Sequence, residues 1–272
     1  MFIYSIWDEI CKNISSNCNT ITINQILNQA NGSKWIAIKH DVETNVSKAL
    51  SLAKIEKKYD IKATYFIQAD LVDDNYKLLQ EIESLGHEVT YHYDVMDANN
   101  GDIEKSIKDF TNNINKFKKY GFEVQTVCPH GNPVMIRNGW SSNKDFFRDK
   151  QVEKLFPYIL DMVVQLQNKL NYKYTYVSDA GYGWKEIVNI ENNDVKNDGD
   201  IDIKDYKELL NIINTKDNLI LSTHPHRWER NSFKFIMNVY LFKVLRFVAR
   251  KISKIPILKN IISKYYYLAK KI

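Results

Sequence analysis

Glycine, proline and cysteine are all scarce in this sequence of 272 residues, which contains 9 glycines, 5 prolines and 3 cysteines. So little glycine and proline excludes fibrous and low-complexity proteins. The cysteines, Cys11, Cys18 and Cys128, are odd in number and have no regular spacing. We therefore expect no disulfide framework and a reducing compartment, which favours a cytoplasmic location.

Long hydrophobic runs are also missing. No stretch approaches the roughly 18 uncharged apolar residues of a transmembrane helix, so we expect no membrane span. The N-terminus has no basic start and carries Asp8 and Glu9 within its apolar part, so we expect no secretory signal peptide. The chain is 44% hydrophobic, and its length is sufficient for one large core.

Charge is spread unevenly along the chain. Residues 229–272 contain 11 lysines and arginines and one acid, which gives this segment a net charge of +10 and leaves −5 for residues 1–228. We therefore expect a globular domain over 1–228 and a basic amphipathic helical tail over 229–272. The basic residues of the tail are interleaved with large apolar ones, which argues against nucleic acid as a partner. Two interpretations stay open: the tail packs on the core, or it lies on an anionic membrane surface.

Segments typical of strands and of helices alternate over the first 228 residues, with short connections. This order predicts a parallel sheet with right-handed crossovers, in an α/β fold. The expected strands are 35–43, 61–67, 87–94, 122–131, 174–179 and 218–224, and the expected helices are 46–59, 74–85, 101–119, 153–169 and 203–214. Between them we expect a long functional loop over 134–153 and an acidic surface loop over 185–203.

Ionisable residues gather at the ends of five of these strands. They are His40, Asp41 and Glu43 after the first strand, then His92 and Asp94, His130, Asp179 and His224. Buried charge is stable only when paired or metal-bound, and in barrel enzymes the carboxyl ends of the strands carry the chemistry. The pattern predicts a catalytic or metal site there, although the first strand alone is equally consistent with a helix cap. Because strand side chains alternate, His40 should face away from Asp41, and His87 is interpreted as structural.

The order of these motifs resembles the polysaccharide deacetylase (NodB-homology, carbohydrate esterase 4-like) family over about residues 35–228, and more narrowly its surface-glycan biosynthesis branch. The matching motifs are Asp41-Val-Glu43, Gly86-His87-Glu88 followed by His92, Cys128-Pro-His-Gly-Asn-Pro133, Asp179 with Trp184, and Leu221-Ser-Thr-His224. The resemblance implies a distorted (β/α) barrel with fewer than eight strands and a metal at its mouth. It also implies an enzyme that hydrolyses acetyl groups on sugars.

Two positions depart from the family pattern. The usual second metal histidine would fall at Met96, whose thioether is a poor ligand for Zn²⁺, and Glu43 stands where the branch usually has aspartate. The resemblance still implies a divalent metal, with Zn²⁺ as the expected ion. Its candidate ligands are Glu43, His92 and His130, with Asp94 as an alternative.

Hydrolysis of an acetamide requires an activated water, a stabilised oxyanion and a protonated leaving amine. We assign Asp41 as the base and His224 as the general acid. Asp179 would orient the imidazole of His224. For substrate binding we expect backbone groups near Asn132 to help at the oxyanion, and Trp184 and Trp228 to form walls for a sugar ring.

The resulting hypothesis is a metal-dependent hydrolase that removes an acetyl group from a sugar in surface-polysaccharide biosynthesis, such as capsule or O-antigen assembly. Its substrate would be an acetylated sugar or a lipid-linked glycan, and the tail would place it at the inner membrane if it binds lipid. The alternative is a catalytically inactive glycan-binding or scaffold protein with the same barrel, for which Met96 is the best support. An amidase acting on a small cyclic or linear amide is a third possibility.

Overall fold

A computed structural model describes residues 1–28, 34–132, 135–179, 182–194 and 199–252. Their strands form one sheet in the order β6-β5-β4-β3-β2-β10-β7-β8-β9, with β1 paired to β2 beside this path. The strands are β1 Asn19–Thr20, β2 Trp35–Val42, β3 Ala63–Ile67, β4 Glu88–Tyr93, β5 Thr126–Pro129, β6 Leu160–Asp161, β7 Thr175–Ser178, β8 Trp184–Glu186, β9 Ile201–Ile203 and β10 Asn218–Thr223.

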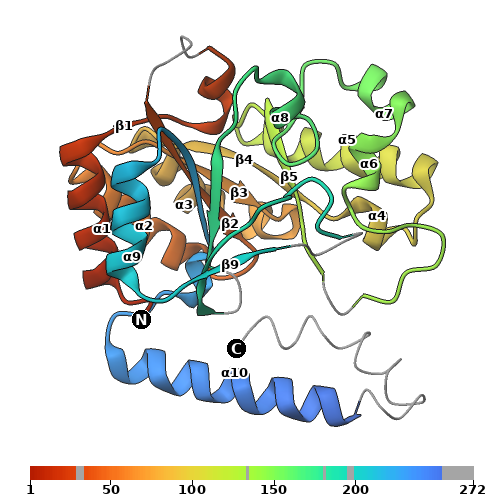
Figure 1. Cartoon of the computed structure of the whole chain (residues 1–272). Coiled ribbons are helices and arrows are strands. Elements are labelled where there is room, and N and C mark those ends of the chain that lie inside the picture. Colours follow the sequence, from red (N-terminus) through yellow and green to blue (C-terminus); the bar gives the residue numbers. More distant parts are fainter. Residues whose placement is uncertain (29–33, 133–134, 180–181, 195–198, 253–272) are drawn as a thin grey trace.

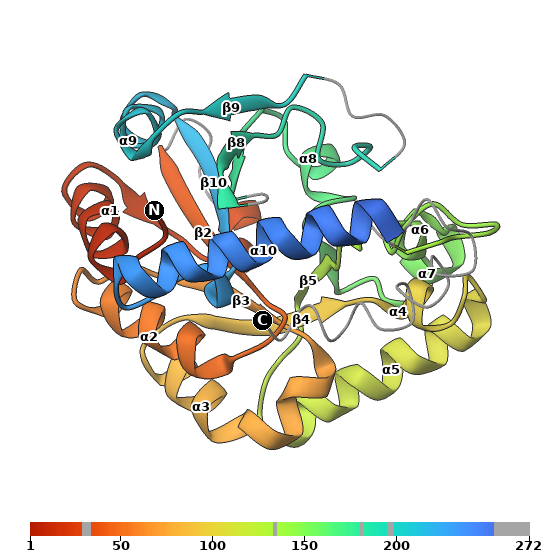
Figure 2. The ribbon, with the colours of Figure 1, turned by 90° about the horizontal axis from the view of Figure 1, so that it is seen from below.

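The sheet is parallel over the seven strands from β6 to β7, and only β8 and β9 add antiparallel pairs. The sheet is strongly curved, with helices outside it (Figures 1 and 2). The α/β class and the distorted barrel with fewer than eight parallel strands are therefore confirmed for the described residues.

Helices connect most successive strands. They are α1 Tyr4–Asn17, α2 Val46–Lys57, α3 Val72–Ser84, α4 Val95–Ala98, α5 Ile103–Lys119, α6 Asp145–Arg148, α7 Lys150–Leu155, α8 Leu166–Lys169, α9 Tyr206–Thr215 and α10 Ser232–Ile252, with short 3₁₀ turns η1 Ile23–Asn28, η2 Ala69–Leu71 and η4 Pro225–Arg227. Side chains of Asn45, Asp102 and Asp205 accept backbone N–H groups at the starts of α2, α5 and α9, which explains why these helices begin there.

The expected helix over 153–169 is wrong. The chain there forms the end of α7, strand β6 and the short helix α8. Asp161 explains the break, because its carboxylate accepts the backbone N–H groups of Val163 and Val164 and holds a turn instead of a helix. The pairing of β6 with β5 then extends the sheet.

Strand β2 is buried along its whole length and alternates between two cores. Ile36 and Ile38 pack in the cluster under the outer helices, whereas Trp35 and Ala37 pack in a second cluster inside the barrel. Odd-numbered residues of β2 therefore face the interior. This alternation decides where the polar end of the strand is presented.

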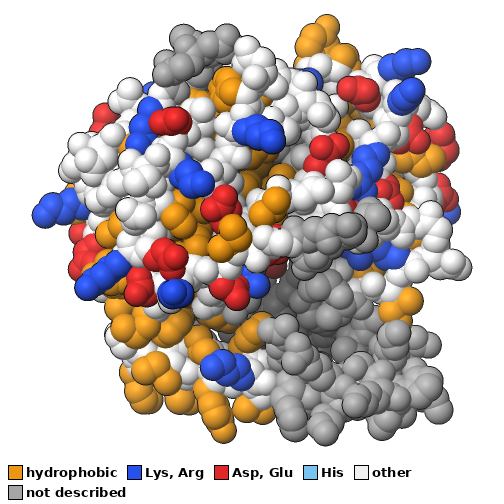
Figure 3. All heavy atoms as spheres, in the orientation of Figure 1, with side chains coloured by type: hydrophobic (Ala, Val, Ile, Leu, Met, Phe, Trp, Pro, Cys, Tyr) orange, Lys and Arg blue, Asp and Glu red, His pale blue; other side chains and the backbone are white. Residues whose placement is uncertain are grey.

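Helix α10 crosses the end of the barrel at which the parallel strands terminate (Figures 1 and 2). Phe235 is its one buried residue among those whose side chains are described, and it packs against Phe2 and Tyr182. Exposed apolar side chains of α10 gather at the lower left in Figure 3: Phe233, Ile236, Met237, Tyr240, Leu241, Phe242 and Val244. None of the described helices combines the length and apolar character needed to cross a bilayer. The division of the chain at residue 228 stays a prediction.

Candidate active site and metal centre

Six of the predicted site residues lie at the carboxyl ends of the parallel strands. Asp41 ends β2 with Glu43 just beyond it, His92 is on β4, His130 follows β5, Asp179 follows β7, and His224 follows β10. The register of a parallel sheet brings these strand ends to one edge, where Glu43 lies within 4.0 Å of ring nitrogens of His92, His130 and His224. Segments far apart in the sequence therefore meet, as the motif order predicted.

Glu43 is at the centre of this group. Its Oε1 lies 3.1 Å from His130 Nε2, 3.9 Å from His92 Nε2 and 4.0 Å from His224 Nε2. Burial alone would raise the pKa of Glu43, but His130, His92 and His224 outweigh it and hold the pKa well below its usual value. Glu43 is therefore an anionic oxygen donor surrounded by ring nitrogens.

The residues Glu43, His92 and His130 fit a divalent cation. One ligand atom from each lies within 4.8 Å of the other two. His92 Nδ1 donates to the Cys128 carbonyl at 3.0 Å, so Nε2 is the nitrogen that faces Glu43, and this buried atom has no hydrogen-bond partner. A buried lone pair aimed at a carboxylate and a second imidazole is the donor arrangement that binds Zn²⁺ and related ions.

Neither of the other two candidate positions joins this group. Asp94 is absent from the groups of three metal-binding side chains within the described residues. Met96 is on α4, where it is buried in the hydrophobic core. The position of the second family histidine is therefore occupied by a core methionine. The second imidazole of the group comes instead from His130, just after β5.

Asp179 holds His224 as predicted. Its Oδ1 accepts His224 Nδ1–H at 2.6 Å, and its Oδ2 accepts the His224 backbone N–H at 2.9 Å and the Thr223 hydroxyl at 2.7 Å. This arrangement turns His224 Nε2 toward Asp41, 3.8 Å from Oδ2. The geometry suits an imidazole that carries a proton to or from the space beside Asp41.

Arg227 is a member of the site that the sequence analysis missed. Its Nη1 lies 2.6 Å from Asp179 Oδ1. Burial raises the pKa of Asp179, but Arg227 and His224 lower it more, so the carboxyl stays ionised although it is fully buried. A fully buried aspartate beside one imidazole needs a second positive group, and this need could have directed attention to the arginine after His226.

Lys39 is a second missed residue. It faces the interior two positions before Asp41, and its Nζ lies 2.9 Å from both carboxylate oxygens of Asp41. Burial raises the pKa of Asp41, and Lys39, His92 and His224 outweigh this effect, so the pKa is lowered. The period of two along a buried strand was the available signal, because it places Lys39 beside Asp41.

The predicted sugar walls are wrong. Trp228 is fully buried, contacts Trp7 and Phe2, and donates its indole N–H to Thr223. Trp184 is also buried and packs on Phe2. Both indoles belong to the core beneath the mouth, so neither presents a face to a ligand. Asn132 is half-buried just after β5, and its carbonyl accepts from Arg137.

The segment 137–148 supports His130 from outside. Asn143 is fully buried, and its side-chain amide donates to the His130 carbonyl at 2.8 Å and to Asp97 at 3.0 Å. Asp97 in turn accepts two hydrogen bonds from Arg137 and one from the Trp140 indole. The backbone that carries His130 is therefore fixed by side chains of the segment expected to be a functional loop.

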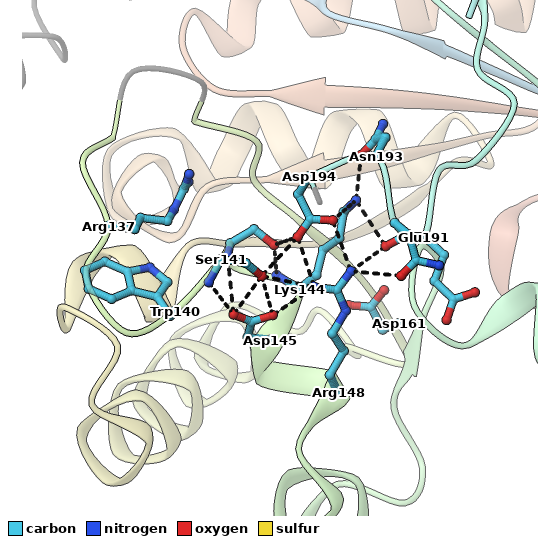
Figure 4. A network of polar contacts seen from close by, with 12 residues as sticks. Arg137, Trp140, Ser141, Lys144, Asp145, Arg148, Asp161, Glu191, Asn193 and Asp194 are labelled. Carbon is cyan, nitrogen blue, oxygen red and sulfur yellow. Dashed lines mark hydrogen bonds and ion pairs between the residues drawn. The ribbon is translucent and has the colours of Figure 1, made fainter. Parts of the chain in front are cut away.

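A second network ties this segment to the acidic stretch near residue 194 (Figure 4). Lys144 donates to the Ile190 carbonyl, Asn193 and Asp194, and Arg148 donates to both oxygens of Asp194. Burial raises the pKa of Asp194, but the hydrogen bonds and charge of Arg148 outweigh this effect, so the pKa is lowered. The expectation of an acidic surface loop over 185–203 is corrected for the described residues: Asp194 is held by ion pairs, and β8 and β9 lie at the two ends of the stretch.

Comparison with known proteins gives one family match and several similar solved structures. Residues 28–132, less than half of the chain, match the polysaccharide deacetylase family. The match confirms the resemblance to NodB-like, carbohydrate esterase 4 proteins over these residues. It includes Asp41, Glu43, His92 and His130, whereas Asp179 and His224 lie outside it. No curated protein sequence matches the chain.

Several solved structures are similar at low identity. The catalytic domain of a peptidoglycan N-acetylglucosamine deacetylase from Eubacterium rectale has 15% identity and a TM-score of 0.47, over 80% of this chain and 87% of that one. A family 4 carbohydrate esterase from Streptomyces lividans has 13% identity and a TM-score of 0.45, over 78% and 89%. A carbohydrate esterase family 4 pseudoenzyme from Bacillus anthracis has 14% identity and a TM-score of 0.45 over 79% of this chain, which spans 63% of that protein.

Proposed function

We propose that this protein is a metal-dependent deacetylase that removes an acetyl group from a sugar during surface-polysaccharide assembly. The observation that carries the proposal is the convergence of Glu43, His92 and His130 beside Asp41 and His224. A cation held by the first three residues would supply Lewis-acid chemistry, lowering the pKa of a water and polarising the acyl carbonyl.

The chain's own residues would perform the proton transfers. Asp41, kept ionised by the Lys39 ammonium, accepts the proton of the attacking water. His224 returns a proton to the leaving nitrogen or oxygen of the sugar, and Asp179 stabilises the charge that the ring carries while it is protonated. Backbone groups near Asn132 remain our proposal for contacts to the developing oxyanion.

The decisive experiment measures bound metal and released acetate on the same preparations. We expect the wild-type chain to bind one divalent cation, Zn²⁺ by our proposal, and to release acetate from an acetylated amino-sugar oligosaccharide. Glu43→Gln should lower metal affinity by at least about tenfold, because a ligand is lost. Asp94→Asn is the matched control and should retain the metal. Metal binding with no acetate release from any acetylated sugar would favour the inactive glycan-binding protein instead.

The partner and the location form a second part of the proposal. The exposed apolar side chains of α10 and its exposed Lys234 and Lys243 suit the surface of an anionic membrane. Because α10 crosses the end of the barrel where the candidate site opens, a lipid-linked glycan would be presented to that end (Figure 2). The three free cysteines support the cytoplasmic face of the inner membrane.

A further inference from the structure

Two groups of side chains within the described residues have the spacing to hold a metal ion, and both include His92. One is Glu43, His92 and His130, and the other is Asp41, His92 and Cys128. The second group is entirely buried and contains a sulfur ligand. An ion in the second group would have Asp41 as a ligand, so the choice between the groups decides whether Asp41 is available as a base.

Lys39 lies within the second group. Its Nζ is 2.9 Å from both Asp41 oxygens and 3.0 Å from Cys128 Sγ, and the side chain is 1% exposed. The rings of Phe66 and Tyr176 lie beside the ammonium, at 5.4 and 5.9 Å from their centres. The ammonium therefore already contacts two of the three ligand atoms that the ion would need. A divalent cation in contact with the same atoms would be strongly repelled by it, because the surrounding side chains are buried.

We propose that Lys39 is a specificity-determining residue, whose ammonium takes the cation position beside Asp41 and Cys128 and thereby directs the divalent metal to Glu43, His92 and His130. The inference rests on the proposed metal dependence. It gives Asp41 a fixed partner that is not the metal, so that its carboxylate remains a base. It also keeps the metal in a nitrogen and oxygen ligand set, without a thiolate.

Cobalt(II) is the probe that separates the two groups. A Co²⁺ ion bound by a thiolate has an intense sulfur-to-metal charge-transfer band in the near ultraviolet, whereas an ion held by imidazole and carboxylate has only weak visible bands. After removal of bound metal by a chelator, the wild-type protein should bind Co²⁺ without the charge-transfer band. Cys128→Ser should leave Co²⁺ affinity within about threefold, well below the effect of losing a ligand.

Lys39→Met removes the charge and keeps an unbranched side chain that is one atom shorter. We expect this variant to acquire the charge-transfer band, and the double variant Lys39→Met with Cys128→Ser to lose it again. Lys39→Arg keeps a positive charge and should resemble the wild type. A charge-transfer band in the wild type, or its absence from a folded Lys39→Met protein that binds Co²⁺, overturns the inference.

The wild-type spectrum and the Cys128→Ser affinity keep the inference falsifiable if Lys39→Met fails to fold. A wild-type chain that binds no Co²⁺ overturns the inference together with the proposed metal dependence. A wild-type chain that binds Co²⁺ through sulfur overturns the inference and leaves the metal dependence intact. Failure of acetate release alone affects the proposed deacetylase activity and not the assignment of the metal.

Discussion

Neighbouring residues of β2, His40 and Asp41, belong to two clusters of imidazoles and carboxylates on opposite faces of the sheet. The outer cluster centres on Glu56, whose Oε1 lies 2.6 Å from His40 Nε2 and accepts the Trp7 indole N–H at 3.2 Å, and whose Oε2 accepts the Tyr65 hydroxyl at 2.7 Å. The inner cluster centres on Glu43, which instead faces the bare Nε2 of His92. The residue types are the same, but their hydrogen bonding and access differ.

The outer cluster is closed. The side chains of Glu56, His40 and His87 are fully buried, and His87 bonds to backbone groups of Ala63 and Ala53. His40 Nδ1 has no hydrogen-bond partner, yet none of these residues belongs to a described group of three metal-binding side chains. The two carboxylates therefore differ in role. Glu56 accepts hydrogen bonds from fixed donors and stabilises the fold, whereas Glu43 lies beside a ring nitrogen without a hydrogen-bond partner at a partly exposed edge, where it can act on a ligand. His40 and His87 lie where the sequence analysis expected them.

The largest expected effect is a loss of acetate release when a residue of the inner cluster is replaced. Asp41→Asn removes the proposed base, so acetate release should fall by about 10² to 10⁴-fold. Acetate assays on an acetylated oligosaccharide, with circular dichroism as a check of folding, measure this change. A variant with less than about a tenfold loss would contradict the role of Asp41.

The outer cluster should respond in the opposite way. Glu56→Gln leaves the imidazole and phenol donors without their anion, which should lower the free energy of unfolding by about 3–5 kcal/mol. Acetate release per folded molecule should stay within about twofold, because Glu56 is separated from the site by the sheet. Urea denaturation of wild type and Glu56→Gln, with acetate assays on the same preparations, provides the test. A fall in acetate release by Glu56→Gln as large as that of Asp41→Asn would remove the distinction between the clusters.

Asp161 is a buried carboxyl group outside both clusters, and it differs from their carboxylates in the direction of its pKa shift. Burial raises its pKa to about 6, despite hydrogen bonds from Tyr93 and from backbone N–H groups. The folded state therefore keeps a proton that the unfolded chain releases near pH 3.8, and stability falls as pH rises between these values. The loss is up to about 3 kcal/mol.

Asp161→Asn is the matched variant for this effect, because its side-chain oxygen still accepts from Val163 and Val164. The difference in unfolding free energy between the variant and wild type should change with pH between about 4 and 6 and be constant above pH 7. Denaturation curves at several pH values measure it. A difference that does not vary with pH would mean that Asp161 titrates normally.

Much of the inner cluster could be predicted from the sequence, and the reason is periodicity. Strands that are buried on both faces are continuous apolar runs, so an ionisable group at their end is conspicuous, as Asp41, His92 and His224 are. Parallel register then places these ends at one edge without further information. The same reasoning failed for residues 153–169, because the turn held by Asp161 depends on side-chain bonds to backbone that periodicity does not record.

The support of the site was harder to predict. Arg227 is recognisable only once the full burial of Asp179 is known. The indoles of Trp184 and Trp228 could equally line a pocket or fill a core, since a large amphipathic ring suits both, and only the position of Phe2 beside them decides for the core. The dependence of His130 on Asn143 joins residues across an irregular segment for which the sequence offers no periodic signal.

Helix α10 differs from both clusters, because most of its described apolar side chains are exposed, although Phe235, Val239 and Phe242 contact the barrel. If an anionic membrane covers them, replacing Phe233 and Tyr240, which are 74% and 68% exposed, by serine should weaken vesicle binding by about tenfold without lowering the unfolding free energy. Tyr158→Ser is the matched control, since Tyr158 is 92% exposed outside α10.

Co-sedimentation with anionic and neutral vesicles measures the effect, and raised salt should weaken binding to the anionic vesicles only. Equal binding by all three proteins would contradict a membrane-binding role of α10, and an acetylated sugar would then reach the inner cluster from solution.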